Sequence, residues 1–528
     1  TAMSARMTVR DPHARRETLA LLAMLAVAYL PQLGAVTGAA RPEEKYNMSV
    51  SAEMHRLGEW ATPTLDGQPW FYKPPLLYWL ERVTYSLSAA TPFTARLPAA
   101  LAAIALALLS GFIARRLGVS RMHTTLLTAG SLGLYLNGRL AITDSLLALG
   151  LAGAFACLWE AHQREASRWV VAAGAMLGVA VLAKGPVAGV IVLGGAAAFT
   201  LLREGRPAVD PLLRPGAIAL AGVAALAVSA PWYVLMYLRH GQRFFDFFFV
   251  QMNVDRFRTP WRVESLGVLW GGLLLTLVPW LPLAIAGLVN ALRRAHRRSP
   301  RSLFALSWAF SVMLTFSIPA QKFVHYSLPA APAFALLVAL LYAEAGDSRL
   351  LRRANAAMAV LFGLMVVVGL VATRVLPVIP ALLTSAAAAV GVVATMKHRP
   401  ALAAASGLAI LALALGWLTP AAGSSPWPDS PVPQRPLYAW REPPGLLEFA
   451  SGRDLVWIRE PGQLDAALQS GGLVWMHERD FPGPPWAVIA EAPMMRGDVK
   501  PAEVLEAFRV GSLQPLMGRV VIVGRPTP

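Results

Sequence analysis

The 528-residue chain is 56% hydrophobic and only 15% charged, with a mean hydropathy of +0.51. A soluble protein of this length cannot bury so much apolar surface in an ordinary core, so the composition excludes that class. A net charge of +17 would suggest nucleic-acid binding in a soluble domain, but here the basic residues gather in short loops between apolar runs. We therefore expect a polytopic membrane protein with no nucleic-acid partner.

Apolar runs along the chain set the expected topology. A membrane-spanning helix needs about 20 mostly apolar residues, because the hydrocarbon layer is roughly 30 Å thick. The first run follows four arginines and lacks the cleavage site of a removable signal peptide, so we expect a retained span. The thirteen runs that predict transmembrane helices are residues 17–38, 95–114, 122–137, 143–160, 169–184, 186–202, 217–236, 264–292, 302–318, 325–344, 354–373, 376–396 and 401–419.

The basic residues orient these helices. With the N-terminus inside, every predicted inner loop is basic, as the positive-inside rule requires. An odd number of spans then places the C-terminal segment outside. We expect a multi-pass protein of a bacterial inner membrane, in contact with membrane lipids. The inner-loop residues are Arg115 and Arg116; Arg164 and Arg168; Arg203, Arg206 and Arg214; Arg293, Arg294, Arg297, Arg298 and Arg301; Arg349, Arg352 and Arg353; Lys397 and Arg399.

The composition changes after residue 420. A Pro/Ser/Gly-rich link at 419–436 precedes short strand-like runs at 454–458, 473–477, 487–490 and 520–523. We expect residues 1–420 to form an all-α transmembrane domain and residues 421–528 a small α/β periplasmic domain. The single cysteine, Cys157, lies in an apolar run and excludes a disulfide within the chain.

The first predicted outer loop, residues 39–94, is too long for a simple connection. Residues 43–57 and 75–90 predict two helices, and the aromatic residues of the loop suit the headgroup level of a membrane. The loop could therefore act only as a clamp on the membrane surface. Those aromatic residues are Trp60, Trp70, Phe71, Tyr78 and Trp79.

Lysines and acids suggest more than a clamp. The chain has six lysines against 41 arginines, yet four lysines (Lys45, Lys73, Lys184 and Lys322) fall on the predicted outer face. A compact ammonium suits a phosphate, although each lysine alone could be a snorkelling surface residue. Asp144 begins an apolar helix, where an unpaired acid is costly; it could instead serve as a helix cap.

The combination of outer lysines with acids suits sugar transfer from a lipid phosphate. The phosphate is the leaving group, so cations must stabilise the charge that develops on it. A carboxylate from Glu43, Glu44 or Asp144 can activate or orient the acceptor on the opposite face of the sugar. The sequence thus predicts an inverting glycosyltransferase.

The chain also resembles a known family: membrane C-superfamily (GT-C) glycosyltransferases related to lipid A aminoarabinose transferase and protein O-mannosyltransferases. The resemblance implies a GT-C fold, a polyprenyl (undecaprenyl) phosphate-linked sugar as donor, and a lipid, glycan or protein as acceptor. The motifs that carry it are Glu43-Glu44, Glu53-Met54, Gly58-Glu59-Trp60, Thr62-Pro63, the run from Lys73 to Trp79, Gly138-Arg139 with Asp144, Ala183 to Pro186, Pro231-Trp232-Tyr233, Arg256-Phe257, and Lys322 with Tyr326 and Pro329.

The resemblance implies roles for individual residues. The first-loop acid, Glu43 or Glu44, would form the catalytic centre with Asp144. Lys73 and Lys184 would bind the carrier phosphate, and Tyr326 would line the pocket. The remaining candidates for substrate binding are Lys45, Tyr78, Arg139, Asn253, Arg256 and Lys322.

The chain departs from the family at two positions that hold a metal in the aminoarabinose enzymes. Tyr72 and Asn253 stand there, and zinc prefers imidazole, thiolate or carboxylate. We therefore expect no metal site and no required cofactor, with a divalent cation kept as an option. Two other functions stay open: a transporter or flippase of lipid-linked sugar, and a catalytically silent scaffold of an envelope complex.

Overall fold

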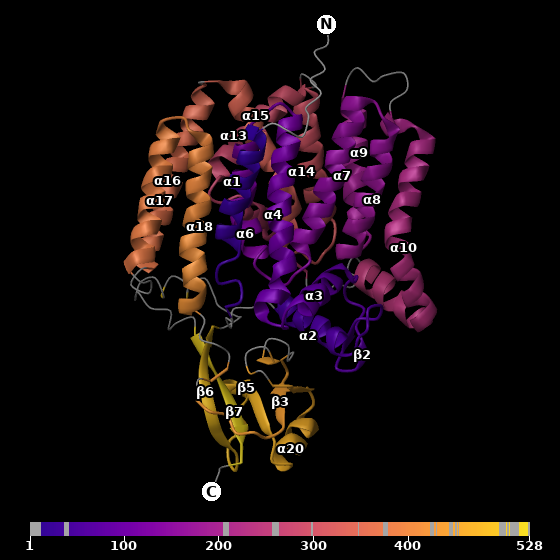
Figure 1. Cartoon of the computed structure of the whole chain (residues 1–528), viewed down its shortest axis with the longest axis vertical. Helices are drawn as coiled ribbons and strands as arrows, with labels where there is room; N and C mark the ends of the chain where they lie inside the picture. Colours follow the sequence, from indigo (N-terminus) through magenta and orange to yellow (C-terminus); the bar gives the residue numbers. More distant parts are fainter. Residues whose placement is uncertain are drawn as a thin grey trace.

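The computed structural model describes residues 12–35, 42–203, 211–255, 263–296, 299–346, 348–372, 378–422, 427–428, 430–442, 447–448, 451, 453–495, 503, 506 and 517–525. The structure is mostly helical, with long helices side by side and a small sheet domain beyond one end of the bundle (Figure 1). The first loop lies between the bundle and the sheet domain, so all three meet on one face.

Every apolar run predicted from the sequence coincides with helical structure. Six helical segments among the described residues are long and apolar enough to cross a membrane, and a bent pair would make a seventh. The chain is thus a multi-pass membrane protein. The helices are α1 (Pro12–Tyr29), α4 (Pro92–Arg116), α5 (Arg121–Ala129), α6 (Leu132–Asn137), α7 (Asp144–Arg164), α8 (Ser167–Lys184), α9 (Val187–Leu202), α10 (Pro215–Phe245), α12 (Leu266–Thr276), α13 (Leu281–His296), α14 (Pro300–Ser317), α15 (Ala331–Ala345), α16 (Arg349–Ala372), α17 (Val378–Met396) and α18 (Pro400–Ala422).

Two runs that we expected to be continuous helices are broken. The run at 122–137 forms α5 and α6, and the run at 264–292 forms α12 and α13, which meet at 106°. The breaks contact each other, because the Leu132 N–H donates to the Val278 carbonyl at 2.8 Å. A side chain at Gly130 would meet the Trp280 ring, with the nearest atoms 2.9 Å apart. Backbone irregularity at membrane depth is tolerated where protein supplies the missing partners, as here.

The helices differ in how deeply they are enclosed. The apolar window of α7 is 83% buried, and that of the segment containing α15 is 94% buried, whereas the window containing α10 is only 11% buried. Helices α7 and α15 therefore form the centre of the bundle. The apolar surface of α10 is typical of a helix that faces lipid.

The first loop folds into two helices joined by a short hairpin. These are α2 (Pro42–Arg56) and α3 (Leu76–Leu87), with β1 (Thr64–Leu65) paired to β2 (Gln68–Pro69) between them. Asp66 and Gly67 form the hairpin turn with positive φ angles of 57° and 69°, a conformation that Gly and Asp tolerate best. The carboxylate of Glu53 on α2 accepts both N–H groups of this turn, at 2.6 and 2.9 Å.

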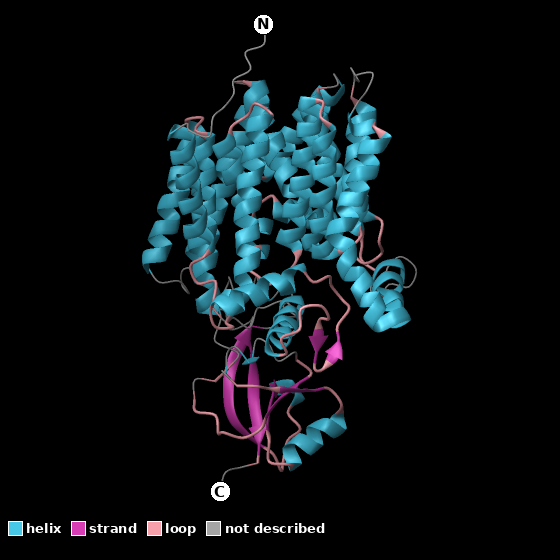
Figure 2. Ribbon diagram, turned by 45° about the vertical axis from the view of Figure 1, so that its right-hand side comes forward, coloured by secondary structure: helices cyan, strands magenta, loops and turns pink. Residues whose placement is uncertain are grey.

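The C-terminal residues form a five-stranded sheet in the order β4-β3-β5-β7-β6, drawn as arrows in Figure 2. Strands β4, β3 and β5 are parallel, and β7 runs antiparallel to β5 and β6. Each face of the sheet has its own apolar cluster. The elements are β3 (Leu437–Trp440), β4 (Val456–Ile458), α20 (Pro461–Gln469), β5 (Leu473–His477), β6 (Ala487–Met495) and β7 (Met517–Gly524).

Candidate active site

Two lysine–carboxylate pairs lie where the first loop meets the ends of α7 and α8. Glu43, in the first turn of α2, pairs with Lys73, which precedes α3, at 2.7 Å. Asp144, the first residue of α7, pairs with Lys184, the last residue of α8, at 2.6 Å. An acid at the N-terminal end and a base at the C-terminal end of a helix both complement the helix dipole. The fold therefore favours these charges at these helix ends.

His325 joins the two pairs into one cluster. It belongs to the 3₁₀ segment η3 (Val324–Ala330), and its Nε2 lies 3.9 Å from Glu43 Oε2 and 3.9 Å from Asp144 Oδ1. The Lys184 ammonium lies over the ring of Tyr326, 4.6 Å from its centroid. The sequence analysis missed His325, although it stands between the two predicted residues Lys322 and Tyr326. Its place between those two residues was the signal from which His325 could have been predicted.

The charges of the two pairs balance: two carboxylates face two ammonium groups. Burial alone would raise the pKa of Glu43, but the nearby Lys73, Lys184 and His325 hold that pKa well below its ordinary value. The Asp144 side chain is only 1% exposed, and its Oδ2 accepts no hydrogen bond from the residues that the structure describes. An ionised, buried oxygen without a donor is costly unless a ligand supplies one.

The two lysines also line one cavity of about 260 Å³. Tyr72, Asn253 and Tyr326 add polar groups, while most of the remaining wall is apolar. Val190 and Ile318 at its edge are 57% and 69% exposed, so the cavity borders the apolar outer surface of the bundle. A cavity with two cations and an apolar rim suits a lipid that carries an anionic headgroup.

The cluster is also the place where a cation could be held. One ligand atom each from Glu43, Asp144 and His325 lie within 4.8 Å of one another. Both carboxylates, however, already have an ammonium group at 2.6–2.7 Å, which a divalent cation would have to displace. The described residues thus favour neutralisation by lysine, and we assign no metal ligands.

Several candidates predicted from the sequence have structural partners instead. Both oxygens of Glu44 are used: Oε1 accepts the Ala141 N–H at 2.9 Å and pairs with Arg96 at 2.7 Å, and Oε2 faces the same guanidinium. Tyr78 is buried and donates to Asn47 at 3.3 Å. Of the two first-loop acids, the structure brings Glu43 to the cluster, while Glu44 ties α2 to α4.

The other predicted cations hold backbone segments. Arg139 donates to the carbonyls of Tyr29 and Pro31 at the end of α1, at 2.6 and 2.8 Å. Lys322 donates to the carbonyls of Pro319 and Glu264 at 2.6 and 3.3 Å. These bonds use the groups that we expected to bind substrate. Arg256, also predicted to bind substrate, lies outside the described residues.

Asn253, which we expected to bind substrate, lines the cavity together with Tyr72. The Asn253 side-chain amide donates to the Phe248 carbonyl at 2.6 Å. Both residues belong to the π-helical segment η2 (Asp246–Val254), so the bond directs the amide nitrogen toward the backbone of that segment. Tyr72 stacks on Trp70, with ring centroids 4.2 Å apart. An amide and a phenol are poor zinc ligands, so the absence of zinc at these two positions stays a prediction.

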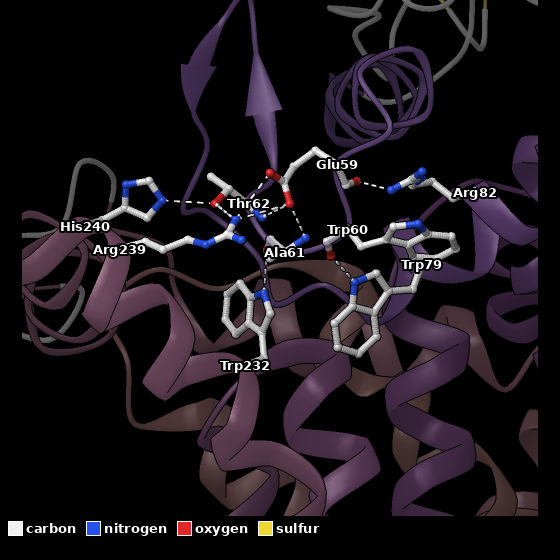
Figure 3. Close-up of polar contacts among 9 residues, drawn as sticks. All are labelled: Glu59, Trp60, Ala61, Thr62, Trp79, Arg82, Trp232, Arg239 and His240. Carbon is white, nitrogen blue, oxygen red and sulfur yellow. Dashed lines mark hydrogen bonds and ion pairs between the residues drawn. The ribbon is translucent and has the colours of Figure 1, made fainter.

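The first loop is fixed to the bundle by the stretch 59–62, which Figure 3 draws with its partners. Trp79 of α3 and Trp232 of α10 donate their indole N–H groups to carbonyls of this stretch, at 2.6 and 2.8 Å. Arg239, near the end of α10, pairs with the Glu59 carboxylate at 3.3 Å. These contacts fix this stretch of the first loop against α3 and α10.

The sheet domain holds the outer side of the same loop. Lys45 of α2 pairs with Glu442 at 3.0 Å, and Glu442 also faces His477 at 3.3 Å. Tyr46 packs against Trp457, with ring centroids 5.9 Å apart. Lys45, which we expected to bind substrate, therefore joins the two domains.

Comparison with known proteins agrees with this geometry. The sequence model of a family described as dolichyl-phosphate-mannose-protein mannosyltransferase matches residues 16–240. The structure superimposes on that of ArnT from Cupriavidus metallidurans bound to undecaprenyl phosphate, with a TM-score of 0.74, 21% identity and coverage of 97% of this chain and 100% of that chain. This chain therefore shares the fold of ArnT over almost its whole length. The apo form of the same ArnT gives a TM-score of 0.75 at 20% identity, with 98% and 100% coverage.

Two sequence relatives of this chain are named as arabinosyl transferases. An undecaprenyl phosphate-alpha-4-amino-4-deoxy-L-arabinose arabinosyl transferase from Aeromonas salmonicida is 29% identical over 58% of this chain and 56% of its own length. Its counterpart from Serratia proteamaculans is 27% identical over 63% and 60%. The chain thus matches less than two thirds of the length of these relatives.

Proposed function

We propose that this chain is an inverting glycosyltransferase that moves a sugar from a polyprenyl (undecaprenyl) phosphate donor to a lipid, glycan or protein acceptor. The observation that carries the proposal is the shared cavity: Lys73 and Lys184 line it, and each is paired to an acid of the cluster. The names of the relatives support an undecaprenyl phosphate donor. Among the three acceptor classes, the relatives favour a lipid.

The lysines would stabilise the leaving group. As the bond between the sugar and the phosphate breaks, negative charge grows on the phosphate oxygen, and preorganised cations lower the barrier most where charge develops. Lys184 is 6% exposed, so its ammonium interacts in a poorly hydrated environment, where electrostatic attraction is strong. The apolar rim would hold the first isoprene units of the tail.

The acids would hold the acceptor. Glu43 uses Oε1 for Lys73 and leaves Oε2 toward His325, while Asp144 uses Oδ1 for Lys184 and leaves Oδ2 without a donor among the described residues. Each acid therefore keeps one oxygen for a substrate hydroxyl. In inversion the acceptor attacks from the face opposite the leaving group, so the acids and the cavity would flank the anomeric carbon.

The proposal includes a topology. Thirteen spans with the N-terminus inside would put the cluster and the sheet domain on the periplasmic side of a bacterial inner membrane. The broken pairs α5–α6 and α12–α13 each count as one span in this arrangement. The inner arginines and the position of the first loop beside the sheet domain support it.

A transfer assay with the purified full chain tests the function. We expect radiolabel from an undecaprenyl-phosphate sugar to become covalently attached to an envelope lipid fraction, with release of undecaprenyl phosphate. Movement of intact donor across a vesicle membrane without covalent transfer would favour a flippase. Binding of donor without transfer or movement would favour a silent scaffold.

A further inference from the structure

His325 is the one titratable side chain of the cluster to which the proposed function gives no role. Its Nε2 is 3.9 Å from both Glu43 Oε2 and Asp144 Oδ1. Those distances are too long for direct hydrogen bonds, which span about 2.7–3.2 Å. One oxygen atom could nevertheless lie about 2.8 Å from His325 Nε2 and from Glu43 Oε2 at once, as bridging groups do.

Both acids of the cluster are paired with lysines, which leaves the imidazole of His325 as its candidate base. Lys73 occupies the other oxygen of Glu43, and Lys184 occupies Asp144 Oδ1. A carboxylate held by an ammonium group is a weak base at neutral pH, and the pKa of Glu43 is accordingly below its ordinary value. An efficient general base titrates near the working pH, and histidine is the side chain that ordinarily does so.

The aromatic side chains beside His325 hold its ring. Phe323 stacks on it with ring centroids 5.4 Å apart, and Tyr326 meets it edge-on at 5.1 Å. The side chain is 10% exposed, and that of Glu43 is 24% exposed, so the gap between them is not sealed from solvent. An acceptor group can therefore approach Nε2 in a fixed geometry.

We propose that His325 is the general base for an acceptor hydroxyl, which binds between His325 Nε2 and Glu43 Oε2. The inference rests on the proposed glycosyl transfer and narrows the acceptor to an alcohol. The hydroxyl oxygen forms a bond to the anomeric carbon, and the bond from that carbon to the phosphate oxygen breaks. Its electron pair leaves with the polyprenyl phosphate beside Lys73 and Lys184, and the hydroxyl proton passes to Nε2 and then to water.

A phosphate acceptor would not use this arrangement. Its attacking oxygen is already ionised and has no proton to give to His325. It would also bring negative charge next to Glu43 and Asp144, at the gap where both acids face the imidazole. Like charges at such separation repel, so this end of the cluster favours a neutral hydroxyl.

Two acceptors with the same tail test the proposal: octyl glucoside, which offers hydroxyls, and octyl phosphate. The purified full chain is supplied with radiolabelled polyprenyl-phosphate mannose or aminoarabinose. We expect transfer to octyl glucoside, with a rate that rises with pH as the general base loses its proton. In His325→Gln this rate should fall about 10²- to 10⁴-fold and lose that rise, as expected for loss of a general base.

His477→Gln is the matched control, because it removes a histidine that also faces a lysine-paired glutamate but lies in the sheet domain. It should keep the wild-type pH profile. Binding of undecaprenyl phosphate to His325→Gln should stay within about twofold of wild type, which checks that the variant is folded.

Three outcomes would overturn the inference. In the first, the wild type uses octyl phosphate and not octyl glucoside, so sugar transfer stands but the acceptor class is wrong. In the second, the rise with pH persists in His325→Gln or is absent from the wild type. In the third, no acceptor receives sugar, and the proposed function fails together with this inference.

Discussion

Two Lys–Glu–His clusters each include one residue from the first turn of α2, and they differ more in their surroundings than in these three residue types. In the inner cluster, Glu43 contacts Lys73 at 2.7 Å and His325 at 3.9 Å. In the outer cluster, Glu442 contacts Lys45 at 3.0 Å and His477 at 3.3 Å. The inner cluster adds a second acid–lysine pair and a cavity with an apolar rim, whereas the outer one joins two domains. The cavity, and not the ion pair, therefore distinguishes the inner cluster as the candidate reactive site.

Among the changes that distinguish the two clusters, loss of the Asp144 carboxylate should reduce turnover the most. We expect Asp144→Asn to lower turnover about 10²- to 10³-fold, comparable to the loss of a preorganised group that acts in the transition state. Turnover of radiolabelled donor measures it, and detergent-solubilised yield checks that the protein is made. The outer-cluster change Glu442→Gln should keep turnover within about threefold. Full turnover in Asp144→Asn would remove this acid from the reaction.

Removal of one lysine from each cluster should show that only the inner lysine binds the donor, whereas the outer lysine joins the two domains. Lys73→Ala should weaken the affinity for undecaprenyl phosphate about 10- to 100-fold, because a charge-assisted bond worth about 1.5–3 kcal/mol is lost. Titration of the purified protein with the carrier measures it. Lys45→Ala should leave this affinity unchanged. Equal loss in both variants would show that the first loop as a whole, rather than the cavity cation, determines binding.

Acid should loosen the outer junction. Burial would raise the pKa of Glu442, but its contacts with His477 and Lys45 outweigh burial and lower the pKa. A depressed carboxyl pKa contributes stability above the ordinary value of about 4.3, and that stability is lost as pH falls through the lower folded-state pKa. Limited proteolysis after residue 420 should therefore speed up below about pH 4 in the wild type. In Glu442→Gln the cleavage rate should depend less on pH.

Chelation should have the smallest effect. Because ammonium groups already neutralise Glu43 and Asp144, we expect EDTA to change the transfer rate by less than about twofold. A loss of activity that zinc or manganese restores would show that a cation displaces the lysines during the reaction. The two clusters would then differ in metal binding as well.

The sequence predicted what depends on hydrophobic periodicity and charge. Each of the thirteen apolar runs coincides with helical structure, and both helices of the first loop lie close to their expected positions. The breaks at residues 130–131 and 277–280 were missed, because an apolar run does not reveal that a distant segment supplies the missing backbone partner. The local signals were Gly130 beside Ser131 at the first break and Pro279 at the second.

For the cavity, residue type and the family resemblance each predicted part of the lining. Lysine was rare in an arginine-rich chain, and Lys73 and Lys184 do reach the cavity together with Tyr326 and Asn253. The adjacent acids Glu43 and Glu44 could not be separated from sequence, since one turn of helix directs them to different partners. His325 was missed because its role depends on two acids about 180 and 280 residues earlier in the chain, a proximity that no local pattern encodes.

The paired breaks in the bundle carry a consequence for biogenesis. The Leu132 amide finds its acceptor only at Val278, a residue made almost 150 positions later. Until that segment emerges from the ribosome, the broken span α5–α6 has an unsatisfied group that hydrocarbon cannot solvate. We expect this span to wait at the translocon or under an insertase, and to enter the bilayer only alongside its later-made partner.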